Sequence, residues 1–332
     1  MINPAVTLAA VMHTYSGIEE SMIYPYTLKA LSIDAGFGWL PSFDYLLEAQ
    51  NGNAQALAMI TTMSKLTTVV SLGASYFSAV LGSSWTSLNV YGGVAVVAAA
   101  EYNGVDLSVA SPINFTSSES ILSILTAAYS YNLQGDERKL LQDIPSDLLN
   151  ELTAVSEVSS NVNAKIESVA EETEQAVQSG ASITDAVLTT MQEVAKIAIA
   201  TEEDVAESVE QLAEGTITAS TLQSSYTIDS FDALVQSIEL PTEASASFNY
   251  LKEQSTQASD DNQAKDDDDG NSDVIVIAAA SAAGVVLVTV AGIVMRIRRR
   301  RRDFQTLTPL IIDPLSSPVR ARVPPEFIGD NP

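Results

Sequence analysis

Few residues in this 332-residue chain have side chains suited to catalysis or metal binding: there is one histidine, His13, and no cysteine. A thiolate metal site, a disulfide framework and a cysteine nucleophile are therefore excluded, and a Ser-His-Asp triad would depend on that one imidazole. Glycine-rich phosphate loops, His-Glu-x-x-His and Gly-x-Ser-x-Gly do not occur in the sequence. We expect no catalytic residue, no metal site, no cofactor and no enzyme activity.

Carboxylates are the most abundant reactive groups. The chain has 42 acidic and 16 basic residues, a net charge of −26, so it has no electrostatic basis for binding nucleic acid. Calcium binding would need a loop that gathers the carboxylates, and no Asp-x-Asp-x-Asp-Gly sequence is present. We expect the glutamates between residues 151 and 207 to form a solvated helix face.

Three residues are candidates for covalent modification. Asn114 begins the only Asn-x-Ser/Thr sequon, Asn114-Phe115-Thr116, and is a candidate glycosylation site if the chain enters a secretory pathway. Thr308 and Ser317 each precede a proline and are candidate phosphorylation sites. The sequon agrees with an extracellular location for its part of the chain, and the two Ser/Thr-Pro pairs are of the kind that proline-directed kinases phosphorylate.

Residues 274–295 form a run of 22 residues without a charge, ended by six arginines. As a helix this run is roughly 33 Å long, enough to cross a hydrocarbon core of about 30 Å. Ala280 and Gly284 form a small-xxx-small pair, which would permit a homodimer through the membrane helix. The flanking arginines are Arg296, Arg298, Arg299, Arg300, Arg301 and Arg302. We predict a single transmembrane helix in the lipid bilayer.

The charge distribution predicts the orientation. Residues 1–273 hold 38 acids and 8 bases, a net charge of −30, whereas residues 296–332 hold 4 acids and 8 bases, a net charge of +4. Positive charge stays on the cytoplasmic side, where arginines also pair with anionic inner-leaflet lipids. We predict a plasma-membrane protein with its N-terminal part outside and a basic, proline-rich, disordered cytoplasmic tail at 296–332.

The N-terminus conflicts with this topology, because residues 1–21 have no Lys or Arg ahead of their apolar residues and do not resemble a secretory signal. Two explanations compete. Either Met1 is internal to a longer protein with an upstream signal, or the chain inserts late with its N-terminal part in the cytosol. We favour the first.

Hydrophobic spacing predicts an all-α protein. Residues 1–131 are expected to form a compact helical domain, with a long helix after Asn53. In residues 146–240, apolar residues alternate at four and three positions over two runs separated by Gly180, which predicts a long antiparallel helical hairpin followed by short helices. Ser182, with Asp185 three positions later, is the predicted cap at the start of the second run. Residues 241–273 are expected to form a flexible acidic stalk.

The N-terminal pattern has NPAVTL at 3–8, FDY at 43–45 and AQAL at 54–57, leading into a long Ala/Val/Leu helix. Over roughly residues 1–100 it resembles the C-terminal helical, membrane-anchored region of large repeat-containing, adhesin-like surface proteins of cyanobacteria and marine microalgae. The calcium-binding repeats of that family are absent here, so the resemblance transfers neither calcium nor adhesion to named residues. It does favour a longer protein upstream.

These features together predict a structural or adhesive surface protein that anchors an acidic helical region and binds an extracellular protein partner. The alternative from another class is a signalling receptor. Because the tail has no catalytic domain, a receptor would act through partners recruited to the phosphorylatable tail.

Overall fold

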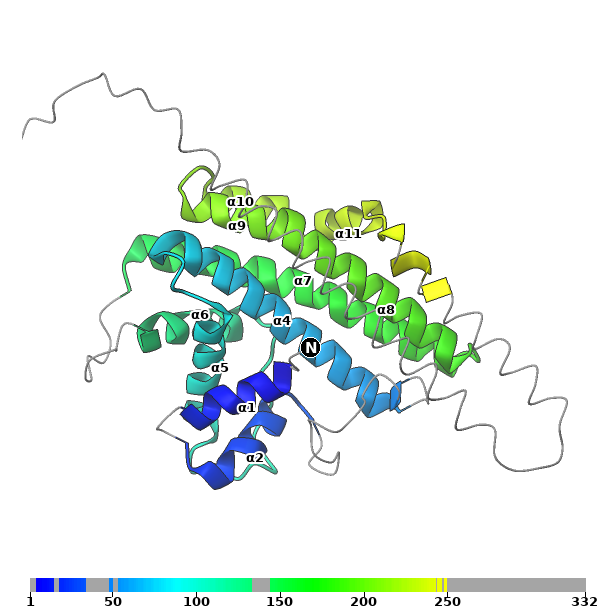
Figure 1. Ribbon diagram of the computed structural model, residues 1–332, viewed down its shortest axis with the longest axis horizontal. Coiled ribbons are helices and arrows are strands. Elements are labelled where there is room, and N and C mark those ends of the chain that lie inside the picture. Colours follow the sequence, from blue (N-terminus) through cyan, green and yellow to red (C-terminus); the bar gives the residue numbers. More distant parts are fainter. Residues whose placement is uncertain are drawn as a thin grey trace, which may run out of the picture. The chain divides into compact units, whose positions relative to one another are not determined.

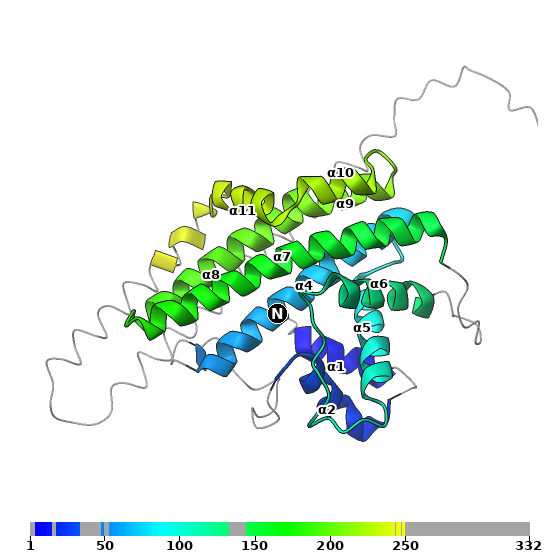
Figure 2. The ribbon, with the colours of Figure 1, turned by 180° about the vertical axis from the view of Figure 1, so that it is seen from behind.

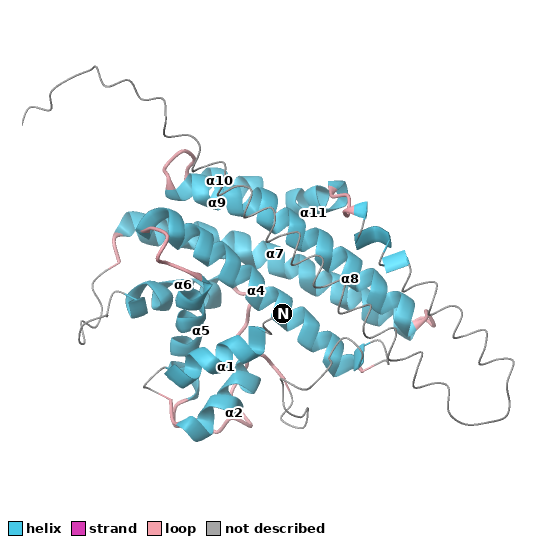
Figure 3. Ribbon diagram, viewed as in Figure 1, coloured by secondary structure: helices cyan, strands magenta, loops and turns pink. Residues whose placement is uncertain are grey.

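The computed structural model describes residues 4–14, 18–33, 48–49, 53–132, 144–242, 244–246 and 248–249. Every regular element among them is helical (Figure 1, Figure 3), so the predicted all-α class is confirmed. Of two units in the chain, Met1–Ala291 and Gly292–Pro332, only the first contains described residues. The predicted transmembrane helix (274–295), the tail (296–332) with its six arginines, Thr308 and Ser317, and the stalk beyond residue 249 lie outside the described residues.

The described residues contain ten α-helices and one π-helical segment. The helices are α1 (Pro4–Thr14), α2 (Glu20–Ala30), α4 (Ala54–Leu81), α5 (Ser87–Tyr102), α6 (Ser118–Asn132), α7 (Ser146–Gln178), α8 (Ile183–Ala200), the π-helical η2 (Thr201–Val205), α9 (Ala206–Ala213), α10 (Ala219–Ser225) and α11 (Ile228–Ser237).

Helix α4 packs against α5, α7 and α9 and is central to the fold (Figure 1). It begins as predicted, because the side chain of Asn53 accepts hydrogen bonds from the backbone N–H groups of Gln55 and Ala56 at 3.1 and 3.3 Å. The segment Gln55–Leu81 is the one described helix long and apolar enough to span a membrane. However, 72 % of the most apolar stretch of this helix is buried inside the protein, as is expected of a helix in a hydrophobic core.

The link between α7 and α8 is a tight turn at Gly180, whose φ of +95° is one that glycine adopts without steric cost. The N–H of Ala181 bonds to the Ala176 carbonyl at 3.0 Å, closing the end of α7. The Ser182 side chain then accepts from the N–H of Asp185 at 3.5 Å and caps α8. The predicted stop and start signals are both confirmed, and α7 and α8 pack against each other (Figure 2).

One continuous hydrophobic core joins helices from both predicted regions, 1–131 and 146–240. It extends from Ala5 in α1 to Phe248, which is 1 % exposed. Phe248 and the buried Ala244 fall within the segment predicted to be a stalk, so the folded part of the chain reaches beyond Pro241. The last described residues therefore contribute to the same core as the first helix.

Candidate modification site and the polar junction beneath it

The sequon lies in the connection between α5 and α6. Two residues anchor this connection to the core: the Tyr102 hydroxyl donates to the Ser111 carbonyl at 3.2 Å, and the Phe115 ring is 3 % exposed. Nearer its start, the Asp106 carboxylate accepts from the Ser108 N–H at 2.9 Å, and this bond lowers the pKa of Asp106. The connection is therefore held at several points along its length.

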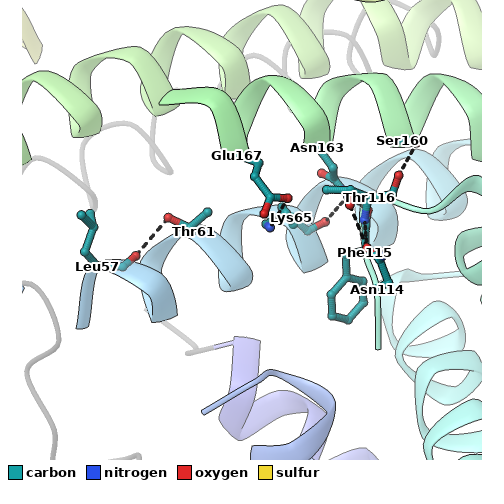
Figure 4. Close-up of polar contacts among 9 residues, drawn as sticks. All are labelled: Leu57, Thr61, Lys65, Asn114, Phe115, Thr116, Ser160, Asn163 and Glu167. Atoms are coloured by element: carbon teal, nitrogen blue, oxygen red, sulfur yellow. Dashed lines mark hydrogen bonds and ion pairs between the residues drawn. The ribbon is translucent and has the colours of Figure 1, made fainter. Parts of the chain in front are cut away.

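Asn114 is exposed and its side chain forms a local turn with Thr116 (Figure 4). Its Oδ1 accepts from the Thr116 backbone N–H at 3.0 Å and from the Thr116 hydroxyl at 2.7 Å. An Asn side chain that bonds two residues ahead in this way mimics a backbone turn. Neither bond uses the amide nitrogen Nδ2, which is the atom that a glycan would join.

Two side chains of helix α7 hold the backbone of the other two residues of the sequon (Figure 4). The Ser160 hydroxyl donates to the Thr116 carbonyl at 2.6 Å, and Asn163 Nδ2 donates to the Phe115 carbonyl at 2.6 Å. Asn163 is fully buried. Because buried carbonyl groups need hydrogen-bond partners, these two side chains stabilise the connection in its observed path.

Helix α4 completes this polar junction. Asn163 Nδ2 also donates to the Lys65 carbonyl at 3.3 Å, and Lys65 Nζ lies 3.0 Å from Glu167 Oε2. The Lys65 side chain is only 13 % exposed, so the ion pair is partly shielded from solvent. Asn163 Oδ1 is buried and has no hydrogen-bond partner among the described residues. The junction fastens α4, α7 and the sequon connection at one point.

The single histidine of the chain lies in α1, outside the residues that form the junction. His13 Nε2 lies 3.8 Å from Glu20 Oε1, with both side chains largely exposed. In the described part of the chain, no three His, Asp or Glu side chains lie close enough to hold a metal ion.

The spacing of the glutamates in residues 151–207 predicts a solvated helix face, but several of them bond across helices. Glu151 accepts from the Tyr76 hydroxyl, and Glu202 accepts from the Ser71 hydroxyl. Glu157 accepts from Gln223 at 2.7 Å. Burial and the bond to Glu151 raise the pKa of Tyr76. These carboxylates lie at the edges of helix contacts, a position that the residue spacing alone does not show.

Comparisons with protein-family models, curated proteins and solved structures found no match. The resemblance of residues 1–100 to large surface proteins stays a prediction. Of the predicted site residues, the structure places Asn114 alone. Its sequon neighbours Phe115 and Thr116 are bonded by Asn163 and Ser160, for which the sequence carried no signal.

Proposed function

We propose that this protein is a single-pass membrane protein that holds an acidic helical region on the outer side of the plasma membrane, in a structural or adhesive role. One observation carries the proposal: the uncharged run at 274–295 ends in Arg296 and the five arginines at 298–302. A stop of this kind suits a membrane interface, where arginine stays on the cytoplasmic side and pairs with anionic lipid.

The continuous core supports a mechanical role. Because Ala5 and Phe248 belong to one core, the first helices and the last described residues are joined by side-chain packing, through which a load on one would pass to the other. Helix α7 and the run from α8 to α9 would form the predicted antiparallel hairpin, roughly 50 Å long at 1.5 Å per residue. Residues 250–273 would then connect the folded region to the membrane.

The charge of the folded region supports an extracellular protein partner with basic groups. Residues 146–240 hold 18 acids and 2 bases, a net charge of −16. Both bases are already paired, Lys165 with Asp232 at 2.5 Å and Lys196 with Glu193 at 2.8 Å. The surface thus carries uncompensated negative charge, which would speed association with a cationic partner and repel anionic ones.

The membrane topology is tested with the full chain carrying one epitope tag at each end. In sealed cells, we expect external protease to remove the N-terminal tag and leave the C-terminal tag intact. Replacing Arg296 and the arginines at 298–302 by Glu should disturb this orientation, whereas replacing Arg320 and Arg322 by Glu is the control for tail charge far from the span. Protection of both tags, or extraction of the chain from membranes by alkaline carbonate, would contradict the proposal.

The alternative function is a receptor that signals through its tail. The two Ser/Thr-Pro pairs at Thr308 and Ser317 are the feature in its favour. Deleting residues 303–332, or combining Thr308→Ala with Ser317→Ala, separates the two functions. A structural anchor keeps its surface display and attachment after either change, whereas a receptor loses its downstream response while it stays at the surface.

A further inference from the structure

We propose that Asn114 carries an N-linked glycan that is attached before α7 docks, and that the finished fold closes the sequon to the transferase. This inference rests on the proposed function, because it requires residues 1–249 to enter the secretory lumen. It specifies the atom that the glycan would join, Asn114 Nδ2, and it limits the reaction to the period before the fold is complete.

The folded protein has room for the glycan. Asn114 is exposed, and both hydrogen bonds that Thr116 donates to this side chain go to the Asn114 oxygen, Oδ1. A bulky, hydrophilic group joined to Nδ2 therefore breaks neither the turn with Thr116 nor the junction below it. The bonds that hold the connection are accepted by the Phe115 and Thr116 carbonyls, and neither bond involves the Asn114 amide nitrogen.

The same contacts prevent the folded sequon from acting as an acceptor. A transferase must read the asparagine and the hydroxyl residue two positions on while their backbone is free. In the fold, the Phe115 ring is buried, the Thr116 hydroxyl donates to Asn114, and both carbonyls are held by α7. Presenting the sequon after folding would require removing Phe115 from the core and breaking the bonds to Ser160 and Asn163.

The order of synthesis provides the opening. Ser160 lies 44 positions after Thr116, and Asn163 lies 48 positions after Phe115. At a synthesis rate of about 5–20 residues per second, the sequon is made roughly 2–10 seconds before the residues that hold it. During this interval Asn114-Phe115-Thr116 is an extended, accessible segment. The fold thus allows modification during synthesis and opposes it afterwards.

The chemical step needs a lipid pyrophosphate-linked oligosaccharide and the transferase that uses it. A bond forms between Asn114 Nδ2 and the anomeric carbon of the sugar, and Nδ2 gives up one proton to a base of the transferase, which releases it to water. The bond between that carbon and the pyrophosphate oxygen breaks, so the lipid pyrophosphate leaves. No electron transfer is involved, and the Asn114 side chain stays neutral.

The first experiment translates the full chain with microsomes from the endoplasmic reticulum. We expect a band of higher apparent mass that a peptide N-glycosidase returns to the unmodified position and that Asn114→Gln abolishes. The matched control combines Asn114→Gln with Val105→Thr, which creates a sequon at the exposed Asn103 in the same connection. Protease treatment of the sealed microsomes reports, separately, whether the N-terminal region is inside.

The outcomes distinguish the inference from the proposed function. A protected N-terminal region without a glycan on Asn114 overturns the inference and leaves the topology standing, with or without modification of the Asn103 control. An unmodified chain whose N-terminal region is digested overturns both. A protected, modified chain that loses its glycan with Asn114→Gln supports both.

The second experiment tests the time window. Microsomes depleted of the lipid-linked donor receive the chain, folding is allowed to finish, and the donor is then restored. We expect little glycan on the wild-type chain and several-fold more on Ser160→Ala, which frees the Thr116 carbonyl but leaves Asn163 in place. Equal modification of the wild-type chain before and after folding would overturn closure by the fold. Ser168→Ala, on the same helix but away from the junction, is the control.

Discussion

Gly93 of α5 lies directly against the backbone of α6, such that a Cβ on Gly93 would be 2.3 Å from the carbonyl oxygen of Ile124. No real Cβ tolerates this distance, so Gly93 sets how closely the two helices approach. Gly73 of α4 differs, because its nearest neighbour is the flexible end of the Leu125 side chain at 2.7 Å.

This difference predicts unequal effects of two glycine substitutions. Gly93→Ala should lower the free energy of unfolding by about 2–3 kcal/mol, because α5 and α6 must separate and the gain in helix propensity offsets only part of the strain. Gly73→Ala should stay within about 1 kcal/mol of wild type, since the Leu125 methyl group can rotate away. Urea denaturation of the full chain in mild detergent, followed by circular dichroism, measures both. Equal losses would contradict the assigned contacts.

The buried Asn163 amide predicts a graded response to substitution. Asn163→Ala removes the donors to the Phe115 and Lys65 carbonyls and should cost about 2–4 kcal/mol of stability. Asn163→Asp should cost more, because it places a carboxylate oxygen against two carbonyl oxygens in a buried site. Thermal unfolding ranks the two variants, with Ser168→Ala as the control. If Asn163→Asp proves more stable than Asn163→Ala, the amide nitrogen of Asn163 does not face these carbonyls.

The uneven charge of residues 146–240 predicts that salt stabilises the protein. This region has 18 acidic residues and only two lysines, and each lysine is already in an ion pair. Repulsion among the remaining carboxylates therefore outweighs the attraction within the two ion pairs. Raising the salt concentration from about 0.01 M to about 0.5 M shortens the Debye length several-fold and screens this repulsion. Tm should rise with sodium chloride. A fall in Tm would mean that the ion pairs, such as Lys65 with Glu167, dominate the electrostatic energy.

Buried tyrosines predict a loss of stability at alkaline pH. Burial raises the pKa of Tyr91 and of Tyr102 to about 12, from the ordinary value of 10. Between these values the unfolded chain loses a proton that the folded chain keeps, so unfolding becomes easier as pH rises. The expected slope is about 1.4 kcal/mol per pH unit for each ring.

Tyr91→Phe is the matched test of this alkaline slope, since it removes the hydroxyl and leaves the ring in the core. The variant should lose less stability than wild type between about pH 10 and about pH 12. Identical slopes for the two chains would show that Tyr91 is not the group that titrates.

Local patterns were sufficient for much of the helical structure. The Asn53 cap, the Gly180 turn and the Ser182 cap each depend on hydrogen bonds to residues within a few positions, so residue types at short spacing predict them. The π-helical turn at Thr201–Val205 had no such signal, because the surrounding apolar residues keep a spacing that ordinary helix also satisfies. The sequon could also be identified from the sequence, because it consists of three consecutive residues.

What the sequence alone determined about this protein is therefore local: the helix type, several helix ends, the acidic charge and the position of Asn114. The tertiary structure decided which helices share the core and which side chains contact the sequon. Asn163 meets the carbonyls of Phe115 and Lys65 across 48 and 98 positions of chain. Contacts at such separations form only when buried surfaces pack together, and no short-range pattern encodes which surfaces those are.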